Sequence, residues 1–180
     1  MNVFIYSLFI FIVLCLILIW YINIYNRYQN YIIRINEAEA NIDSTLRKRF
    51  DLLNKSIGII KSNTDKEKVL DTISNLRSKK LTNFELDRRL YEAINEFSKY
   101  KEDYPKLKTN EGYMKIDLGI SETEAEIVAS RKYYNDIITD YNKLVRTFPS
   151  NVVAKISKYK VRNYFDGKDM NDDIVNDFKL

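Results

Sequence analysis

Three glutamates on one expected helix, Glu122, Glu124 and Glu126, are the first side chains to weigh for chemistry. Helical carboxylates hold di-iron centres in four-helix bundles, but those centres also need a Glu-x-x-His motif on each of two helices. The chain contains no histidine, so this ligand set cannot be completed. We therefore predict that the three glutamates form a solvated acidic face, and we expect no metal and no cofactor.

The rest of the composition argues against an enzyme. Without histidine there is no Ser-His-Asp or Cys-His catalysis, and the single cysteine, Cys15, cannot form an internal disulfide. The chain has no Gly-rich phosphate loop, zinc spacing or RNA-binding motif, and a net charge of +4 is too small to indicate nucleic acid. An enzyme using lysine, tyrosine and carboxylates alone is the least favoured alternative, with Tyr133 or Tyr141 as the place to look. We predict a non-enzymatic protein.

Residues 155–165 interleave basic with apolar side chains and contain no acidic residue. The side chains that could make contacts outside the chain are Lys155, Lys158, Tyr159, Lys160, Arg162, Tyr164 and Phe165. One interpretation is a segment that touches anionic lipid headgroups or a membrane partner, because each basic residue near an anionic leaflet contributes on the order of 1 kcal/mol. The other interpretation is a solvated loop that packs its aromatic rings on the helices.

The N-terminal stretch is typical of a membrane anchor. Residues 3–22 carry no charge, and as a helix they are about 30 Å long, which matches the hydrocarbon core of a bilayer. Trp20 and Tyr21 stand at the C-terminal end of this stretch, where amphipathic rings prefer the membrane interface. A cleaved signal peptide needs a basic start and a small-residue cleavage site, and the stretch offers neither. We predict a single-pass anchor over residues 1–24 that contacts the lipid bilayer through residues 3–22.

The charges that flank the span predict its orientation. Arg27 and Arg34 follow it, whereas only the terminal amine precedes it. Lysine and arginine are enriched in the cytoplasmic flanks of membrane spans. We therefore predict that the protein lies in the cell membrane with its N-terminus outside and its larger domain in the cytoplasm.

Two long amphipathic helices are expected in the remaining chain. The first continues straight out of the span to about residue 62, because apolar residues from Tyr28 to Ile60 recur every three, four or seven positions. The last covers about residues 110–147, where tyrosines recur at seven-residue steps, and we expect these rings to pack in the core. Asn135 and Asn142 repeat with the same spacing, and they either fix the register between helices or face water.

Between these helices lie two capping boxes, each at a break in the apolar stripe. Thr64 with Glu67, and Thr82 with Glu85, have the spacing of N-cap and N3 residues that exchange hydrogen bonds at a helix start. The helix that Thr82 opens should end near Tyr104, because proline comes next and disfavours helical geometry in the residue before it. Each capping box therefore predicts one more helix.

Four long helices with short connections predict an all-α fold, in which an N-terminal transmembrane helix precedes an antiparallel (up-down-up-down) four-helix bundle. We expect the bundle over residues 25–165 and a polar acidic tail over residues 166–180. The first soluble helix is about 57 Å long and the last is similar, so the last helix returns to the bilayer. This arrangement puts Phe148 and residues 155–165 near the membrane surface.

Several blocks of sequence match a known family. They are Glu37-Ala38, Asn41-Ile42-Asp43, residues 46–53, residues 104–111, Glu122-Thr123-Glu124, residues 131–136 and Tyr141-Asn142, with Phe148–Ala154 (FPSNVVA) the strongest and Tyr164-Phe165 a closing aromatic pair. On these blocks the chain resembles the LemA family of bacterial membrane proteins over roughly residues 1–166. It departs from the family pattern at Glu39, Lys155 and Val161, and at Asn54-Lys55, where the family has Pro-Asn. Losing that proline should leave the first helix straighter.

The resemblance implies an N-terminal anchor and an antiparallel helical bundle with no established activity. Members of the family are often encoded beside membrane-bound proteases, which points to partnership with such an enzyme. We therefore expect a scaffold or interaction protein that meets the bilayer and a membrane protein partner, with self-association left open and no nucleic acid bound. The alternative is a regulatory adaptor of a membrane-bound enzyme such as a protease.

Overall fold

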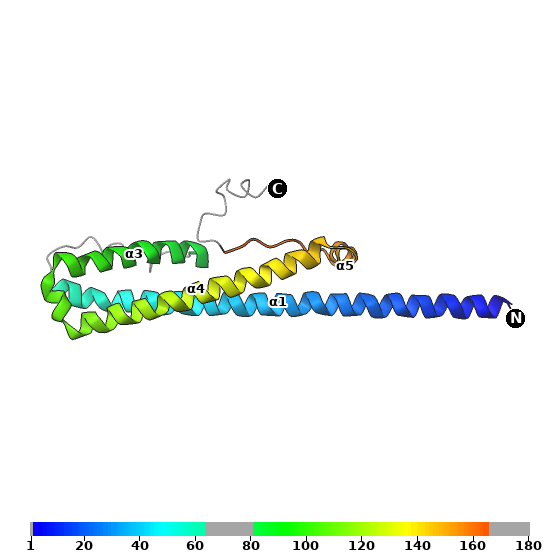
Figure 1. The fold of residues 1–180 in the computed structure, drawn as a ribbon, viewed down its shortest axis with the longest axis horizontal. Coiled ribbons are helices and arrows are strands. Elements are labelled where there is room, and N and C mark those ends of the chain that lie inside the picture. The colour runs from blue at the N-terminus through cyan, green and yellow to red at the C-terminus, as the bar shows by residue number, and fades with distance from the viewer. Residues whose placement is uncertain (1, 64–80, 166–180) are drawn as a thin grey trace. The chain divides into compact units, whose positions relative to one another are not determined.

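The computed structural model describes residues 2–63 and 81–165 (Figure 1). Every regular element in these ranges is helical: α1 (Asn2–Asn63), α3 (Asn83–Asp103), η1 (Pro105–Thr109), α4 (Glu111–Arg146) and α5 (Ser150–Ile156). The all-α prediction is therefore confirmed for the described part of the chain. The helix expected after the Thr64–Glu67 capping box and the tail over residues 166–180 lie outside the described residues.

The first helix, α1, runs without a break from the apolar stretch into the polar part of the chain, as the sequence predicted. It contains no proline, and its one glycine, Gly58, stands in open space. An 18-residue window of α1 has a mean hydropathy of 3.0, and none of that window is buried. Among the described residues this is the one helix long and apolar enough to cross a membrane. A core helix of the same composition would bury its side chains, so the exposed stretch fits a single-pass anchor.

The polar part of α1 buries one face at seven-residue steps. Tyr28, Ile35 and Ile42 form one fully buried series, and Leu46, Leu53 and Ile60 form a second. This spacing is typical of long helices that pack nearly parallel to their neighbours. The periodicity of the sequence therefore identified the buried face correctly.

The start of α3 has the expected capping geometry. The Thr82 hydroxyl accepts from the Glu85 backbone N–H at 3.3 Å, and the Glu85 carboxylate accepts from the Thr82 N–H at 3.0 Å. This backbone hydrogen bond holds the pKa of Glu85 below its usual range. The helix ends at Asp103, one residue before the predicted end, and Tyr104 caps it by donating its N–H to the Tyr100 carbonyl oxygen.

The last long helix, α4, is close to its predicted bounds, but the helix after it was not predicted. Asn110 caps α4 by accepting from the Tyr113 N–H at 3.0 Å. After α4 the chain turns through Phe148 and Pro149, and seven residues form α5. The buried Ser150 hydroxyl lies 2.6 Å from the Leu144 carbonyl oxygen and ties the first residue of α5 back to α4.

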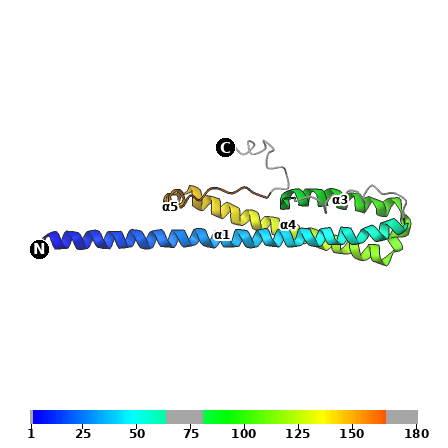
Figure 2. The same cartoon turned by 180° about the vertical axis from the view of Figure 1, so that it is seen from behind.

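The contacts divide the chain into two compact units. Of the described residues, we call 2–37 with 135–164 the anchor unit, and 38–63 with 81–134 and Phe165 the core unit. Within the anchor unit, α5 lies beside α1 in both views (Figure 1 and Figure 2), and side-chain hydrogen bonds described below connect them. Within the core unit, α3 lies alongside the second half of α1.

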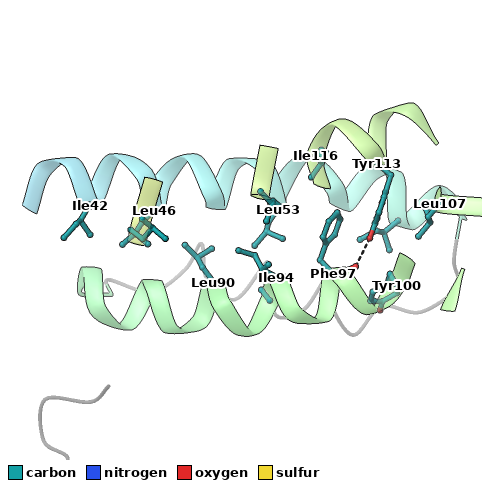
Figure 3. Packing of buried hydrophobic residues seen from close by; sticks show 14 of the residues in the cluster. Ile42, Leu46, Leu53, Leu90, Ile94, Phe97, Tyr100, Leu107, Tyr113 and Ile116 are labelled. Carbon is teal, nitrogen blue, oxygen red and sulfur yellow. Dashed lines mark hydrogen bonds between the residues drawn. The ribbon is translucent and has the colours of Figure 1, made fainter. Parts of the chain in front are cut away.

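The core unit contains the main hydrophobic cluster. Leu46 and Leu53 of α1 face Leu90 and Phe97 of α3 in this cluster (Figure 3). The Phe97 and Tyr113 rings stack with their centroids 4.5 Å apart, and the Tyr113 hydroxyl donates to the Phe97 carbonyl oxygen at 2.8 Å. A stacked pair of this kind adds about 0.5–1.5 kcal/mol to its burial. The cluster gives α1, α3 and the start of α4 a common core.

Candidate functional site

Tyr28 is a buried residue that connects the two chain segments of the anchor unit, 2–37 and 135–164. It stands on α1, six residues after the apolar stretch, and its side chain is fully buried. Its hydroxyl lies 2.7 Å from the Leu144 carbonyl oxygen and 3.2 Å from that of Ser150, and donates to both. Burial raises the pKa of Tyr28, so the ring remains a neutral donor. One side chain of α1 thereby holds the end of α4 and the start of α5.

Tyr159 completes an aromatic cluster around Tyr28. Its ring centroid lies 4.6 Å from that of Tyr28 and 6.3 Å from that of Tyr25, and Tyr28 meets Tyr141 edge-on at 6.0 Å. Gln29 donates from Nε2 to the Tyr159 hydroxyl at 2.7 Å. Burial raises the pKa values of Tyr141 and Tyr159 as well. In this cluster Tyr28 donates hydrogen bonds and Tyr159 accepts one. Neutral rings with raised pKa values make poor bases at neutral pH.

The C-terminus of α5 has a defined cap. The Tyr159 N–H donates to the Ala154 carbonyl oxygen at 2.9 Å, and the Lys158 N–H donates to the Lys155 carbonyl oxygen at 3.4 Å. Lys158 has a φ of 58°, the left-handed conformation that this Schellman cap requires and that glycine usually supplies. The family pattern has small or glycine residues in this region, whereas this chain places lysines there.

The predicted interface aromatics, Trp20 and Tyr21, are both half-buried. The Tyr21 ring stacks on Tyr25 with centroids 6.3 Å apart, and its hydroxyl lies 3.2 Å from Ser157 Oγ. A hydrogen bond thus joins the last turn of the apolar stretch to Ser157, the residue that caps the C-terminus of α5. The role of these two rings at a membrane interface stays a prediction.

The chain beyond α5 is held against α4 by Asn142. Its Nδ2 donates to the Arg162 carbonyl oxygen and its Oδ1 accepts from the Arg162 N–H, both at 2.8 Å. Further along α4, the Thr139 hydroxyl lies 3.4 Å from the Tyr164 hydroxyl. Of the two readings of Asn142, solvent exposure is wrong, because the side chain is 8% exposed and bonds the backbone. It fixes the returning segment rather than another helix.

The structure separates the residues predicted to contact a membrane or partner. Lys155, Lys158, Lys160 and Tyr164 are exposed, Tyr159 and Arg162 are half-buried, and Phe165 is buried. Phe165 packs in the core unit against Phe84 and Tyr134, with centroids 5.9 and 6.2 Å away. The segment thus packs rings on the protein, as its second interpretation proposed, and presents three lysines. Contact of those lysines with lipid or a partner stays a prediction.

A cavity of about 340 Å³ opens in the anchor unit between α1 and the α4–α5 turn. Its lining combines charged, hydroxyl-bearing and apolar side chains: Ile24, Arg27, Tyr31, Asp140, Lys143, Leu144, Thr147, Phe148, Pro149 and Ser150. Two cations and one carboxylate leave it with a single positive charge. Sequence reasoning missed this cavity, because its residues come from positions more than a hundred apart in the chain.

The acidic face on α4 is exposed, as predicted, but two of its members are paired. Glu124 accepts from Arg49 at 2.6 Å and Glu126 from Lys48 at 2.8 Å. Arg49 is only 1% exposed, a burial that the short basic run in the sequence did not reveal. In the part of the chain that the structure describes, no three carboxylates or thiols gather as metal ligands.

An exposed apolar helix that continues into a packed helical body defines a helical protein with a candidate membrane span in α1. The family model described as LemA family matches residues 38–177, which is most of the chain. The chain therefore belongs to the LemA family, as its sequence blocks predicted. Protein LemA of Metamycoplasma hominis is 33% identical over 145 residues, which are 76% of this chain and 63% of that protein. The chain thus spans less than two thirds of the length of this relative.

Proposed function

We propose that this chain is a single-pass protein of the bacterial cell membrane whose helical body is a non-enzymatic scaffold for other proteins. The observation that carries the proposal is the apolar window of α1, which is helical and uncharged and contains no buried residue. Burial in lipid removes such a surface from water at low cost. The arginines after the span favour an outside N-terminus and a cytoplasmic body. We expect that body to be an up-down-up-down helical bundle.

Extraction of membranes with alkaline carbonate tests the anchor. Arginines at Ile12 and Leu16 would each cost about 2.5–3.5 kcal/mol at the centre of a span, so I12R/L16R should release the chain into the soluble fraction. The matched control is I33R/Y91R, because these residues outside the span are also apolar and exposed. Release of the unaltered chain would overturn the anchor.

An apolar strip on α4 supports the interaction role. Met114, Leu118 and Val128 are 53–62% exposed, and their spacing places them on one side of the helix. Scattered apolar residues are normal on surfaces, whereas three on one side of a helix form a face that a partner can cover. We propose this face as the contact through which the scaffold meets membrane proteins or a second copy of itself.

Photo-crosslinking from Leu118 in native membranes tests this contact and separates it from the alternative. Many envelope proteins, or copies of the chain, support a scaffold, whereas one dominant enzyme such as a protease supports a regulatory adaptor. The matched control carries the crosslinker at Lys99, an exposed polar position on α3. Equal yields from both positions would show that α4 presents no specific face.

The exposed lysines of residues 155–165 support a second contact, with anionic headgroups or a membrane partner at the bilayer surface. A chain that begins at Tyr25 should bind vesicles rich in phosphatidylglycerol, and changing Lys155, Lys158 and Lys160 to Glu should weaken this binding. Three exposed lysines elsewhere, Lys99, Lys108 and Lys115, give the same change in net charge as a control. Equal binding by both triple variants would remove the contact.

A further inference from the structure

Three large apolar side chains stand exposed at four-residue steps where α4 turns into α5. Phe148 is 77% exposed, Val152 41% and Ile156 63%. Side chains four apart lie on one face of a helix, so Val152 and Ile156 share a face of α5, and Phe148 precedes it by one turn. The opposite side of α5 is used for packing, since Ser150, Val153 and Ala154 are buried there. α5 is therefore amphipathic with its apolar face turned outward.

Hydrogen bonds place this face beside the end of the apolar stretch. Ser157, next to Ile156, lies 3.2 Å from the hydroxyl of Tyr21, one residue before the stretch ends. At the other end of α5, Ser150 bonds Tyr28, which is six residues beyond the stretch. Six residues of helix rise about 9 Å, so α5 covers the level at which headgroups begin. Interfacial helices bury their apolar side about 5–10 Å into that boundary.

The charges around the apolar face match an anionic membrane surface. Lys155 and Lys158 flank Ile156 and are both exposed. Arg27 and Lys143 line the cavity that also includes Phe148, and they outnumber its one carboxylate, Asp140. A helix with basic residues around an apolar face is typical of segments that lie in the interface plane.

We propose that α5 and the turn before it form an interfacial element, in which Phe148, Val152 and Ile156 insert into the bilayer that α1 crosses. This inference rests on the proposed anchor and adds a second lipid contact from the opposite end of the chain. The occupant is the headgroup and upper acyl region of that same leaflet. The C-terminal part of the anchor unit then lies in the membrane interface instead of in the water above it.

Tryptophan quenching in vesicles tests the insertion with the full chain. The single tryptophan, Trp20, is first replaced by Phe, and one tryptophan is then introduced by F148W or I156W, both at exposed positions. In phosphatidylglycerol vesicles brominated high on the acyl chains, both emissions should be blue-shifted and quenched severalfold. The matched control Y91W, at a 57% exposed position on α3, should stay red-shifted and unquenched. Circular dichroism checks that each variant is folded.

The native Trp20 separates failure of the insertion from failure of the anchor. If Trp20 is quenched in the unaltered chain while F148W and I156W match Y91W, the anchor stands and the interfacial element is wrong. If Trp20 is not quenched, the anchor and the inference that depends on it both fall. Emission at positions 148 and 156 that shifts with the protein-to-lipid ratio, without bromine quenching, would assign the face to a second copy and overturn the lipid contact.

Discussion

The side-chain amide of Asn142 and the backbone of Arg162 exchange two hydrogen bonds of 2.8 Å, although twenty residues separate them. A side-chain amide carries both a donor and an acceptor, so it can bond the N–H and the carbonyl of one residue, as the backbone of a neighbouring strand does. This pair orders the segment after α5 along α4 without any helix or sheet. It is the contact on which the position of residues 160–164 most directly depends.

Replacing Asn142 with leucine should detach that segment. N142L keeps the approximate size but leaves a backbone N–H and carbonyl unpaired, which costs roughly 1–3 kcal/mol. Urea unfolding should report this loss, and the Arg162 amide should exchange with solvent much faster. N163A, at an exposed position in the same segment, should change neither measurement. Unchanged exchange at Arg162 in N142L would contradict this role.

Replacing Lys158 with glycine should stabilise the protein. Lys158 has a φ of 58°, and a side chain in this left-handed conformation costs roughly 1–2 kcal/mol. Because glycine is also freer in the unfolded chain, we expect K158G to gain about 0.5–1 kcal/mol in the free energy of unfolding. The matched control is K155G, which removes the same charge from the helical part of α5 and should lose about 1 kcal/mol. A loss in both variants would show that the cap gains nothing from glycine.

The tyrosine cluster should make stability fall at high pH. Burial raises the pKa values of Tyr28, Tyr141 and Tyr159, so the folded state favours their neutral forms. Their contribution is fully present below the unfolded pKa of about 10 and is lost as pH rises through the folded pKa values. Y28F should flatten this alkaline decline, measured as the midpoint of urea unfolding against pH. Y91F, which changes an exposed ring, should leave its slope unaltered.

Two ion pairs of the core unit should differ severalfold in energy. Arg131 donates from Nη2 to both carboxylate oxygens of Asp87, whose side chain is 5% exposed. R131M strands this buried carboxylate and should lose about 3–5 kcal/mol. Lys48 and Glu126 form an exposed pair, so K48M should lose less than about 1 kcal/mol. Thermal and urea unfolding measure both, and equal losses would show that burial does not set the difference.

Local chemistry in the sequence was enough to predict the long helices. The spacing of Tyr28, Ile35 and Ile42 gave the buried face of α1, and the Thr82–Glu85 capping box gave the start of α3. These signals act within one or two helical turns, so neighbouring residues contain them. The signal for the candidate membrane span is equally local, because twenty uncharged residues define it.

The short helix and the anchor-unit contacts could not be predicted in the same way. A seven-residue helix has little stability of its own, and α5 is held by Ser150 and Tyr28, which belong to distant parts of the chain. Arg49 appears in the sequence as one of three adjacent basic residues, and only packing shows that it is buried beside Glu124. Contacts between positions about a hundred residues apart carry no local signal.

The uninterrupted course of α1 has a mechanical consequence. Neither proline nor glycine occurs between Val3 and Ile57, so the helix contains no residue that favours a kink where the apolar stretch ends. A change in bilayer thickness alters the tilt of a spanning helix. Because α1 has no kink, such a tilt would also move the turns of α1 that contain Tyr21, Tyr25 and Tyr28. The contacts of these tyrosines would then move α5. With the proposed anchor in place, a change in bilayer thickness would therefore move the C-terminal segment together with α1.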